Sequence, residues 1–129
     1  MLASIAALRP KIGGGAYAAS QAALERLVRV MAVELGGEHI RVNAIAPATV
    51  DTPMIRNAMK DDAPFGYRLS GTSPLGRIAT PADIVGVIRF LLTPASNYIN
   101  GAMIPVDGGT SAAFVGGGSL DAPAPGHAG

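Results

Sequence analysis

Tyr17 has a serine 13 positions before it, Ser4, and a glutamine four positions after it, Gln21; hydroxyls of these types can transfer protons, but the spacing alone does not identify an active site. A free phenol titrates at about pH 10, so it is a poor base at neutral pH unless a nearby cation stabilises the phenolate. Residues i and i+4 share one helix face, so a helix through Tyr17 would place Gln21 beside it. Glutamine can hydrogen-bond there but brings no charge.

The composition argues against several other kinds of chemistry. The chain has no cysteine, and its two histidines, His39 and His127, lie in unrelated contexts, so we predict no disulfide and no metal site. A formal net charge of +1 gives no electrostatic case for nucleic acid. No apolar run approaches the roughly 20 residues that span a bilayer, and residues 1–4 carry no basic leader. We therefore expect a cytoplasmic protein without a membrane partner.

A helix over residues 17–35 should position Tyr17. The pair Glu25 and Arg29 has the i,i+4 spacing that stabilises a helix, and Gly36-Gly37 should end it. The apolar side chains recur at helical spacing and are Leu24, Leu27, Val28, Met31 and Leu35.

Three further elements follow. Within residues 39–46, Ile40 and Val42 alternate with polar residues before Pro47 ends the run, which predicts a strand. Thr80 as N-cap, Pro81 in the first turn and Asp83 at the third position predict a helix over 81–92, whose wide apolar face implies burial on more than one side. Residues 102–106 predict a short strand, with Pro105 suited to an edge position and a turn over 107–109.

Helices alternating with short strands indicate an α/β fold with a parallel sheet. Two strands and a strand remnant at residues 1–4 make a small sheet with an open edge, so we expect a missing part of the sheet or a partner that replaces it. We place the domain over residues 1–112. The Gly/Pro/Ala-rich stretch 113–129 cannot bury enough surface to offset its ordering entropy and should be a flexible tail.

An ordered series of motifs resembles the short-chain dehydrogenase/reductase family, whose members carry Tyr-x-x-x-Lys at the head of such a helix and a serine 13 positions earlier. Further matches are Arg41-Val42-Asn43-Ala44-Ile45-Ala46-Pro47, Val50-Asp51-Thr52-Pro53-Met54, Gly76-Arg77, Thr80-Pro81-Ala82-Asp83-Ile84 and Val106-Asp107-Gly108-Gly109. The similarity covers residues 2–112. It implies the C-terminal part of a doubly wound, Rossmann-type parallel sheet, truncated at its N-terminus.

The resemblance implies an NAD- or NADP-dependent oxidoreductase acting on a secondary alcohol or ketone. Tyr17 would be the general acid/base, Ser4 would hydrogen-bond the same substrate oxygen, and Gln21 would stand at the position of the lysine. It also implies cofactor contacts, from Tyr17, Gln21, Pro47, Val50 and Thr52. Asn43 is expected to be a structural strand residue.

Three departures from the family pattern bear on activity. Gln21 replaces the lysine ammonium that stabilises the phenolate, so we predict a strongly impaired catalyst. Pro47-Ala48 stands where the family has Pro-Gly, which could shift the carboxamide contacts. The glycine-rich, phosphate-binding turn is absent, since Gly13-Gly14-Gly15 follows no strand.

Two other interpretations remain open. The chain could be a non-catalytic interaction protein that forms a homo-oligomer or pairs with a full-length relative. It could also be a gene fragment whose start is misplaced at Met1.

The role of the apolar residues after Pro53 is also open. Met54, Ile55 and Met59 could form part of a substrate lid within residues 54–74, or an apolar helix that caps the core.

Overall fold

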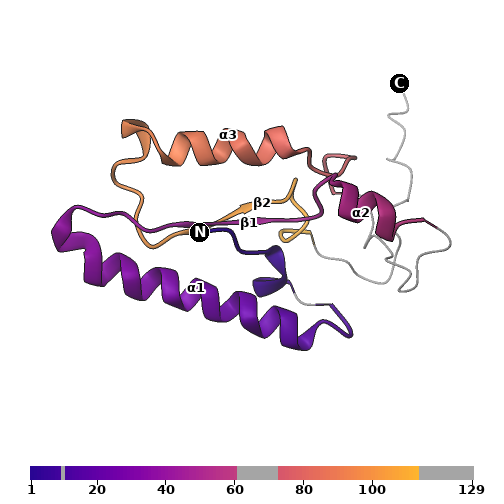
Figure 1. Cartoon of the computed structure of the whole chain (residues 1–129), viewed down its shortest axis with the longest axis horizontal. Helices are drawn as coiled ribbons and strands as arrows, with labels where there is room; N and C mark the ends of the chain where they lie inside the picture. Colours follow the sequence, from indigo (N-terminus) through magenta and orange to yellow (C-terminus); the bar gives the residue numbers. More distant parts are fainter. Residues whose placement is uncertain (10, 61–72, 114–129) are drawn as a thin grey trace, which may run out of the picture.

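The computed structural model describes residues 1–9, 11–60 and 73–113. Two strands lie between two long helices, with α1 on one face and α3 on the other (Figure 1). The helices are α1 (Gly15–Leu35), α2 (Pro53–Ala58) and α3 (Pro81–Leu91), and the strands are β1 (Ala44–Pro47) and β2 (Met103–Val106). Three short 3-10 turns, η1 (Ile5–Ala7), η2 (Gly36–Glu38) and η3 (Pro94–Ser96), connect them.

The sheet is parallel, as predicted. β1 pairs with β2 in the register Ala44↔Met103 to Pro47↔Val106. On the other side of β1, the Ala3 amide donates to the Ile45 carbonyl at 2.8 Å and the Ile45 amide donates to the Met1 carbonyl at 3.0 Å. The strand remnant at residues 1–4 therefore pairs with β1, and β2 lies at the edge, where its Pro105 needs no amide for a further strand.

Helix α1 confirms the predicted helix and begins two residues earlier, at Gly15. Arg29 and Glu25 form the expected ion pair at 2.7 Å. The inward face of α1 carries the fully buried Val28, which forms a core cluster with Ala3 and Ala44. Three partly buried side chains pack against that cluster, namely Leu24, Val42 and Met103. This cluster holds α1 against the sheet.

Strand β1 is shorter than predicted: the Val42 carbonyl accepts the Gly101 amide at 2.8 Å, but other hydrogen bonds of residues 40–43 involve side chains instead of a strand ladder. The Val42 amide donates to Asn100 Oδ1 at 2.8 Å. Asn43 Nδ2 donates to the Ile99 carbonyl at 2.8 Å, and Asn43 Oδ1 accepts the Ala102 amide at 3.0 Å. Asn43 is thus structural, as expected. All four β1 residues are buried, so the strand is covered on both faces, as a parallel sheet requires.

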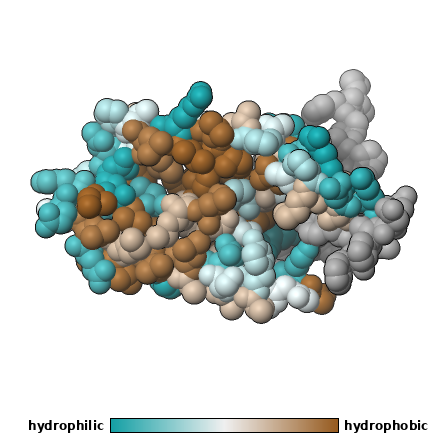
Figure 2. Space-filling model, in the orientation of Figure 1, coloured by the Kyte–Doolittle hydropathy of each residue, from teal (hydrophilic) through white to brown (hydrophobic). Residues whose placement is uncertain are grey.

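Helix α3 confirms the predicted start. Thr80 and Asp83 form a complete capping box, and Pro81 occupies the first turn. The expected burial on more than one side is wrong, because Ile84 is the one buried residue of α3, whereas Val85 and Ile88 are 43% and 40% exposed. Among the described residues, two strands and a bridged remnant offer too narrow a surface to cover the helix. Hydrophobic surface accordingly gathers over α3 and across the layer between α3 and α1 (Figure 2).

Some expectations lie outside the described residues. The predicted tail is one, apart from Ala113, and residues 61–72 of the proposed substrate lid are another. Within that lid region the structure places Met54 and Ile55 on helix α2, which begins after Thr52. Among the described helices, none combines the length and apolar character needed to cross a bilayer.

Candidate active site

A cleft of roughly 1200 Å³ opens where the strands end. Its described lining comes from η1, the first turn of α1, the loop after β1, helix α2, the segment before α3 and the turn after β2. Open α/β sheets bind ligands outside the carboxyl ends of their strands, so this is the expected place for a site.

Ser4 and Tyr17 both line this cleft. Ser4 follows the strand remnant and is the N-cap of η1, with Oγ accepting the Ala6 amide at 3.2 Å. That bond uses Ser4 Oγ as an acceptor, so its hydroxyl hydrogen remains available to a ligand. Tyr17 lies in the first turn of α1 and is 56% exposed. No hydrogen bond joins its phenol to a described residue, so the phenol can meet a ligand.

Gln21 lies one turn further along α1, as its spacing predicts. It is half-buried, its Nε2 donates to Ser20 Oγ at 3.4 Å, and Ser20 Oγ donates to the Tyr17 carbonyl at 2.7 Å. The side chain is therefore close to the backbone of Tyr17, but it is not part of the described cleft lining.

In the loop after β1, the backbone amide and carbonyl of Val50 have no described hydrogen-bond partner. Val50 bridges to Ala79: the Asp51 amide donates to the Ala79 carbonyl at 2.8 Å and the Ala79 amide donates to the Thr49 carbonyl at 3.1 Å. In such a bridge the amide and carbonyl of Val50 itself face the other way, and no described group hydrogen-bonds them. A donor beside an acceptor, both without a described hydrogen-bond partner, fits a primary carboxamide such as that of nicotinamide.

Thr52 and Ala48 line the cleft near Val50, whereas Pro47 is buried in β1 and is absent from the lining. Thr52 Oγ1 caps α2 by accepting the Ile55 amide at 3.4 Å, so its hydroxyl can still donate to a ligand. Among the described non-glycine residues, positive φ occurs at His39 alone. Alanine at position 48 therefore adopts an ordinary backbone conformation, and the replacement of glycine introduces no strain there.

Ion pairs stabilise the walls of the cleft. Arg56 Nε lies 2.6 Å from Asp51 Oδ1, and its hydrogen bonds lower the pKa of the Asp51 carboxyl. Arg77 contacts both carboxylate oxygens of Asp83 at 2.7 and 2.9 Å, and the pKa of Asp83 is lowered by these bonds and by further hydrogen bonds from Thr80. These pairs join the loop after β1 to α2 and the segment before α3 to its first turn.

The turn after β2 forms another wall. Burial raises the pKa of Asp107, but hydrogen bonds from Ser111 and Gly109 outweigh it, so the net pKa is lowered. Gly108 has φ of +60°, and a Cβ there would lie 2.5 Å from Ser73 Oγ, so glycine is required where the turn meets Ser73. The motif match predicted this turn, but not what it packs against.

Arg9 is a cleft residue that the sequence analysis did not identify. Its Nη1 donates to the Thr110 carbonyl at 2.6 Å, across 101 positions of the chain. One feature of the sequence could have indicated it: Arg9 is a basic residue only five positions after Ser4 in the chain, so it lies near that serine.

Parallel strands flanked by helices, with a cleft at the strand ends, define a Rossmann-type α/β protein. Residues 1–111 match the family described as enoyl-(acyl carrier protein) reductase. Levodione reductase of Leifsonia aquatica is 37% identical over 117 residues, covering 87% of this chain and 44% of the relative. The 2,3-dihydro-2,3-dihydroxybenzoate dehydrogenase of Escherichia coli is 39% identical over 117 residues, covering 85% and 47%. The chain belongs to the short-chain dehydrogenase/reductase family.

Solved structures agree with this assignment. The crystal structure of levodione reductase superposes with a TM-score of 0.76 at 36% identity, covering 88% of this chain and 46% of that one. A 4-hydroxyisoleucine dehydrogenase complexed with NADH superposes with a TM-score of 0.70 at 31% identity, covering 88% and 45%. The chain thus spans less than half the length of these relatives.

Proposed function

We propose that this chain carries the nicotinamide and substrate end of an NAD(P)-dependent oxidoreductase that interconverts a secondary alcohol and a ketone in the cytoplasm. One observation carries the proposal: Ser4 and Tyr17, from different elements, line one cleft together with Val50 and Thr52. Several similar proteins have names that include reductase or dehydrogenase, and one solved structure is a dehydrogenase complexed with NADH.

The chain's own residues would act on the substrate oxygen. In the reducing direction the Tyr17 phenol donates its proton to the carbonyl oxygen as the alcohol forms, and in the oxidising direction the phenolate accepts that proton. The Ser4 hydroxyl donates a hydrogen bond to the same oxygen, which favours the developing negative charge. NAD(P)H supplies the hydride when bound.

The backbone of Val50 and the Thr52 hydroxyl would hold the nicotinamide carboxamide. Gln21 would hydrogen-bond a ribose hydroxyl without providing the positive charge that favours a tyrosine phenolate. Each pKa unit of lost stabilisation corresponds to about 1.4 kcal/mol, so losing about two units would cost roughly 100-fold in rate. We therefore expect slow turnover from the chain as it stands.

Reduced nicotinamide mononucleotide tests this proposal directly, because it contains the nicotinamide and ribose but no adenine half. We expect its ketone-dependent oxidation to be slow with the unmodified chain and about 100-fold faster with Gln21→Lys. Adding Tyr17→Phe to Gln21→Lys should abolish the gain.

The matched control is Ala23→Lys, which adds the same charge at an exposed position of α1 that does not share a face with Tyr17. It should leave the rate unchanged. Equal rates for the unmodified chain and Gln21→Lys would contradict the role given to the missing lysine. No hydride transfer by Gln21→Lys to any ketone in a broad panel would contradict the proposed function itself.

A second candidate function is non-catalytic pairing with another copy or with a full-length relative. The outer face of α1 exposes Leu27 by 48%, Val30 by 50% and Val33 by 83%, which leaves an apolar surface on a soluble helix. Light scattering on the purified chain should then show a defined dimer, and Val33→Glu should convert it to a monomer. A monomer at all concentrations would contradict this function.

A further inference from the structure

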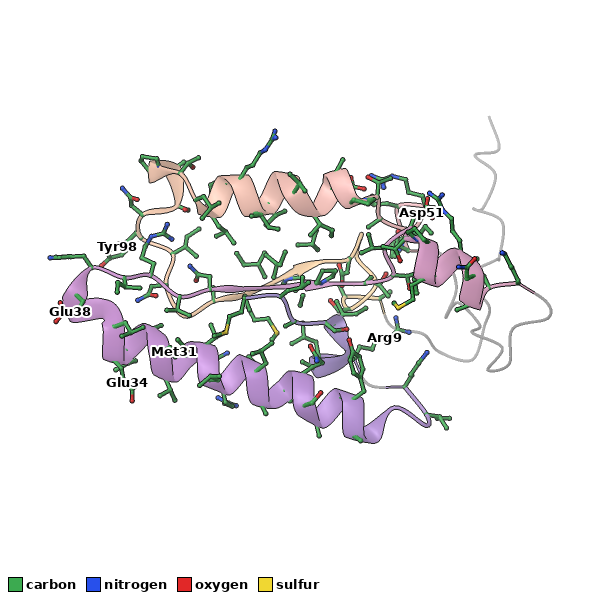
Figure 3. All side chains as sticks on the ribbon, in the orientation of Figure 1. Arg9, Met31, Glu34, Glu38, Asp51 and Tyr98 are labelled. Carbon is green, nitrogen blue, oxygen red and sulfur yellow. The ribbon has the colours of Figure 1, made fainter. Side chains whose placement is uncertain are left out.

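Arg9 occupies a fixed position beside the proposed catalytic pair. Its amide donates to the Ile5 carbonyl at 2.7 Å, which ties it to the 3-10 turn that Ser4 caps. Its side chain is part-buried and reaches the Thr110 carbonyl after β2. Figure 3 shows Arg9 at the same end of the molecule as Asp51 and α2, where the strands end. The guanidinium is therefore held within the cleft rather than extended into solvent.

The charge of Arg9 is not neutralised by a described carboxylate. The charged side chains of the described lining are Arg9, Lys11, Arg77, Asp83 and Asp107. Asp83 is paired with Arg77, and both Asp107 oxygens accept amides of its own turn. Arg9 makes one described side-chain bond, through Nη1 to a neutral carbonyl. A guanidinium has five N–H donors, so Nε and Nη2 remain for a ligand.

The rest of the lining is largely apolar. Around the Ser4 and Tyr17 hydroxyls, the cleft presents the side chains of Ile5, Val50, Met54, Ile55, Leu75 and Val106. A largely apolar lining with an arginine that no described carboxylate neutralises suits a ligand with an apolar body and one anionic group, because the guanidinium fork matches a carboxylate in a bidentate arrangement. With a neutral ketone in the cleft, no carboxylate of the described lining would balance that charge.

We infer that Arg9 binds a carboxylate of the substrate, so that this cleft takes a keto acid or hydroxy acid rather than a neutral ketone. The inference rests on the proposed function for the place of the reacting carbon, at Ser4 and Tyr17. The carboxylate lies away from that carbon, against Nε and Nη2 of Arg9. Arg9 is thus a specificity residue that takes no part in proton or hydride transfer.

The test compares 4-acetylbenzoate with 4-acetylbenzamide, which share a ketone and an aromatic body and differ in charge. Dissociation constants are measured by ligand-observed NMR without cofactor, so the result does not depend on turnover. The unmodified chain should bind the carboxylate at least about tenfold more tightly, since a charge-assisted hydrogen bond is stronger than a neutral one. Arg9→Met should reduce the ratio to about one, and Arg9→Lys should retain part of it.

Arg89→Met is the matched control, because it removes the same charge from an exposed position on α3 outside the lining. It should keep the full preference. No preference in the unmodified chain, or an undiminished preference in Arg9→Met, would overturn the inference. A merely structural role for the bond to Thr110 would lower the thermal midpoint and weaken both ligands equally, which would also overturn it.

This result is separable from that of the proposed function. Ser4→Ala and Tyr17→Phe should abolish hydride transfer but keep most of the carboxylate preference. If hydride transfer fails in every variant while the preference for the carboxylate ligand disappears with Arg9→Met, the result supports the anion site and contradicts the proposed reaction. If hydride transfer to 4-acetylbenzoate and to 4-acetylbenzamide proceeds equally well, the result supports the proposed reaction and contradicts the anion site.

Discussion

The two long helices on either face of the sheet are stabilised in opposite ways. Helix α1 is well packed, with Val28 fully buried against Ala3 and Ala44, but its N-cap is Gly14, which makes no side-chain cap bond. Helix α3 has a complete capping box at Thr80 and Asp83 but buries just Ile84 of its described residues. Local hydrogen bonds define the start of α3, whereas tertiary packing holds α1.

This difference bears on the site, because Tyr17 lies in the uncapped first turn of α1. The buried residues of that helix, Val28 and Ala32, lie about three and about four turns further along. The N-terminal turn of α1, which carries the phenol, thus belongs to a helix that is well packed further along, but no side-chain cap stabilises this turn itself. The first turn of α3 forms a fixed wall of the same cleft through the pair Arg77 and Asp83.

The largest expected effect on stability comes from a valine-to-alanine substitution in α1, compared with the same substitution in α3. Val28→Ala should lower the free energy of unfolding by about 2–3 kcal/mol, because it deletes fully buried methyl groups and leaves a cavity. Val85→Ala, at a position 43% exposed, should cost less than about 1 kcal/mol. Urea denaturation measures both. Equal losses would mean that α3 is as tightly packed as α1.

Removing the cap of α3 should have a smaller effect. Thr80→Ala deletes the hydroxyl that accepts the Asp83 amide, and losing such a cap costs about 1 kcal/mol. Thr80→Ser retains a capping hydroxyl and should stay within a few tenths of a kcal/mol of the unmodified chain. The same urea titration applies. A loss from Thr80→Ser as large as that from Thr80→Ala would point to the methyl group instead of the cap.

Acid should weaken α3 through Asp83. Hydrogen bonds from Arg77, and then from Thr80, lower the pKa of this carboxyl in the folded chain, whereas an unfolded aspartate titrates at about 3.9. The unfolded state therefore binds more protons in acid, so this contribution is complete above about pH 4 and is lost as the pH falls toward the folded value. The side chains are exposed, so solvent and salt reduce the effect.

Asp83→Asn checks this pH dependence. The urea midpoints of the unmodified chain and the variant should differ most near pH 6, and the difference should narrow steadily as the pH falls below about 4 toward the lowered folded pKa of Asp83, while Asp51 and Asp107 titrate alike in both. A gap that does not change with pH would contradict the assignment.

Adding a cap to α1 should have the smallest effect. Gly14→Ser offers a capping hydroxyl, but glycine is only a few tenths of a kcal/mol worse than serine at an N-cap. A Cβ at this position would also lie 3.2 Å from the Lys11 carbonyl oxygen, which offsets part of the gain. We expect a change within about 0.5 kcal/mol by urea denaturation. A gain above about 1 kcal/mol would show that the missing cap limits α1.

Much of the fold could be predicted from local patterns. The spacing of Leu24 and Val28 predicted α1, and Thr80 with Asp83 predicted the start of α3, because both signals involve residues within about one turn of each other. Strand β1 was predicted too long. Its true beginning depends on Asn100, whose side chain accepts the Val42 amide from 58 positions away and also donates to the Ala32 carbonyl.

Some members of the candidate site were predictable from the sequence, but their arrangement was not. Motif spacing identified Ser4, Tyr17 and Thr52, and the structure places all three along one cleft. Gln21 and Pro47, identified in the same way, lie outside the described lining. The contact between Arg9 and Thr110 had no sequence signal, because nothing local relates residues so far apart.

The sequence by itself determined the family, the two helices and the absence of a lysine at position 21. These depend on residue identity and on interactions between near neighbours in the chain. The tertiary structure alone decided that Val50 pairs with Ala79 and presents its own amide and carbonyl elsewhere, and that Arg9 lies in the cleft without a described counter-ion. The physical reason is that both depend on how the strands order and pack, which brings together residues distant in the chain.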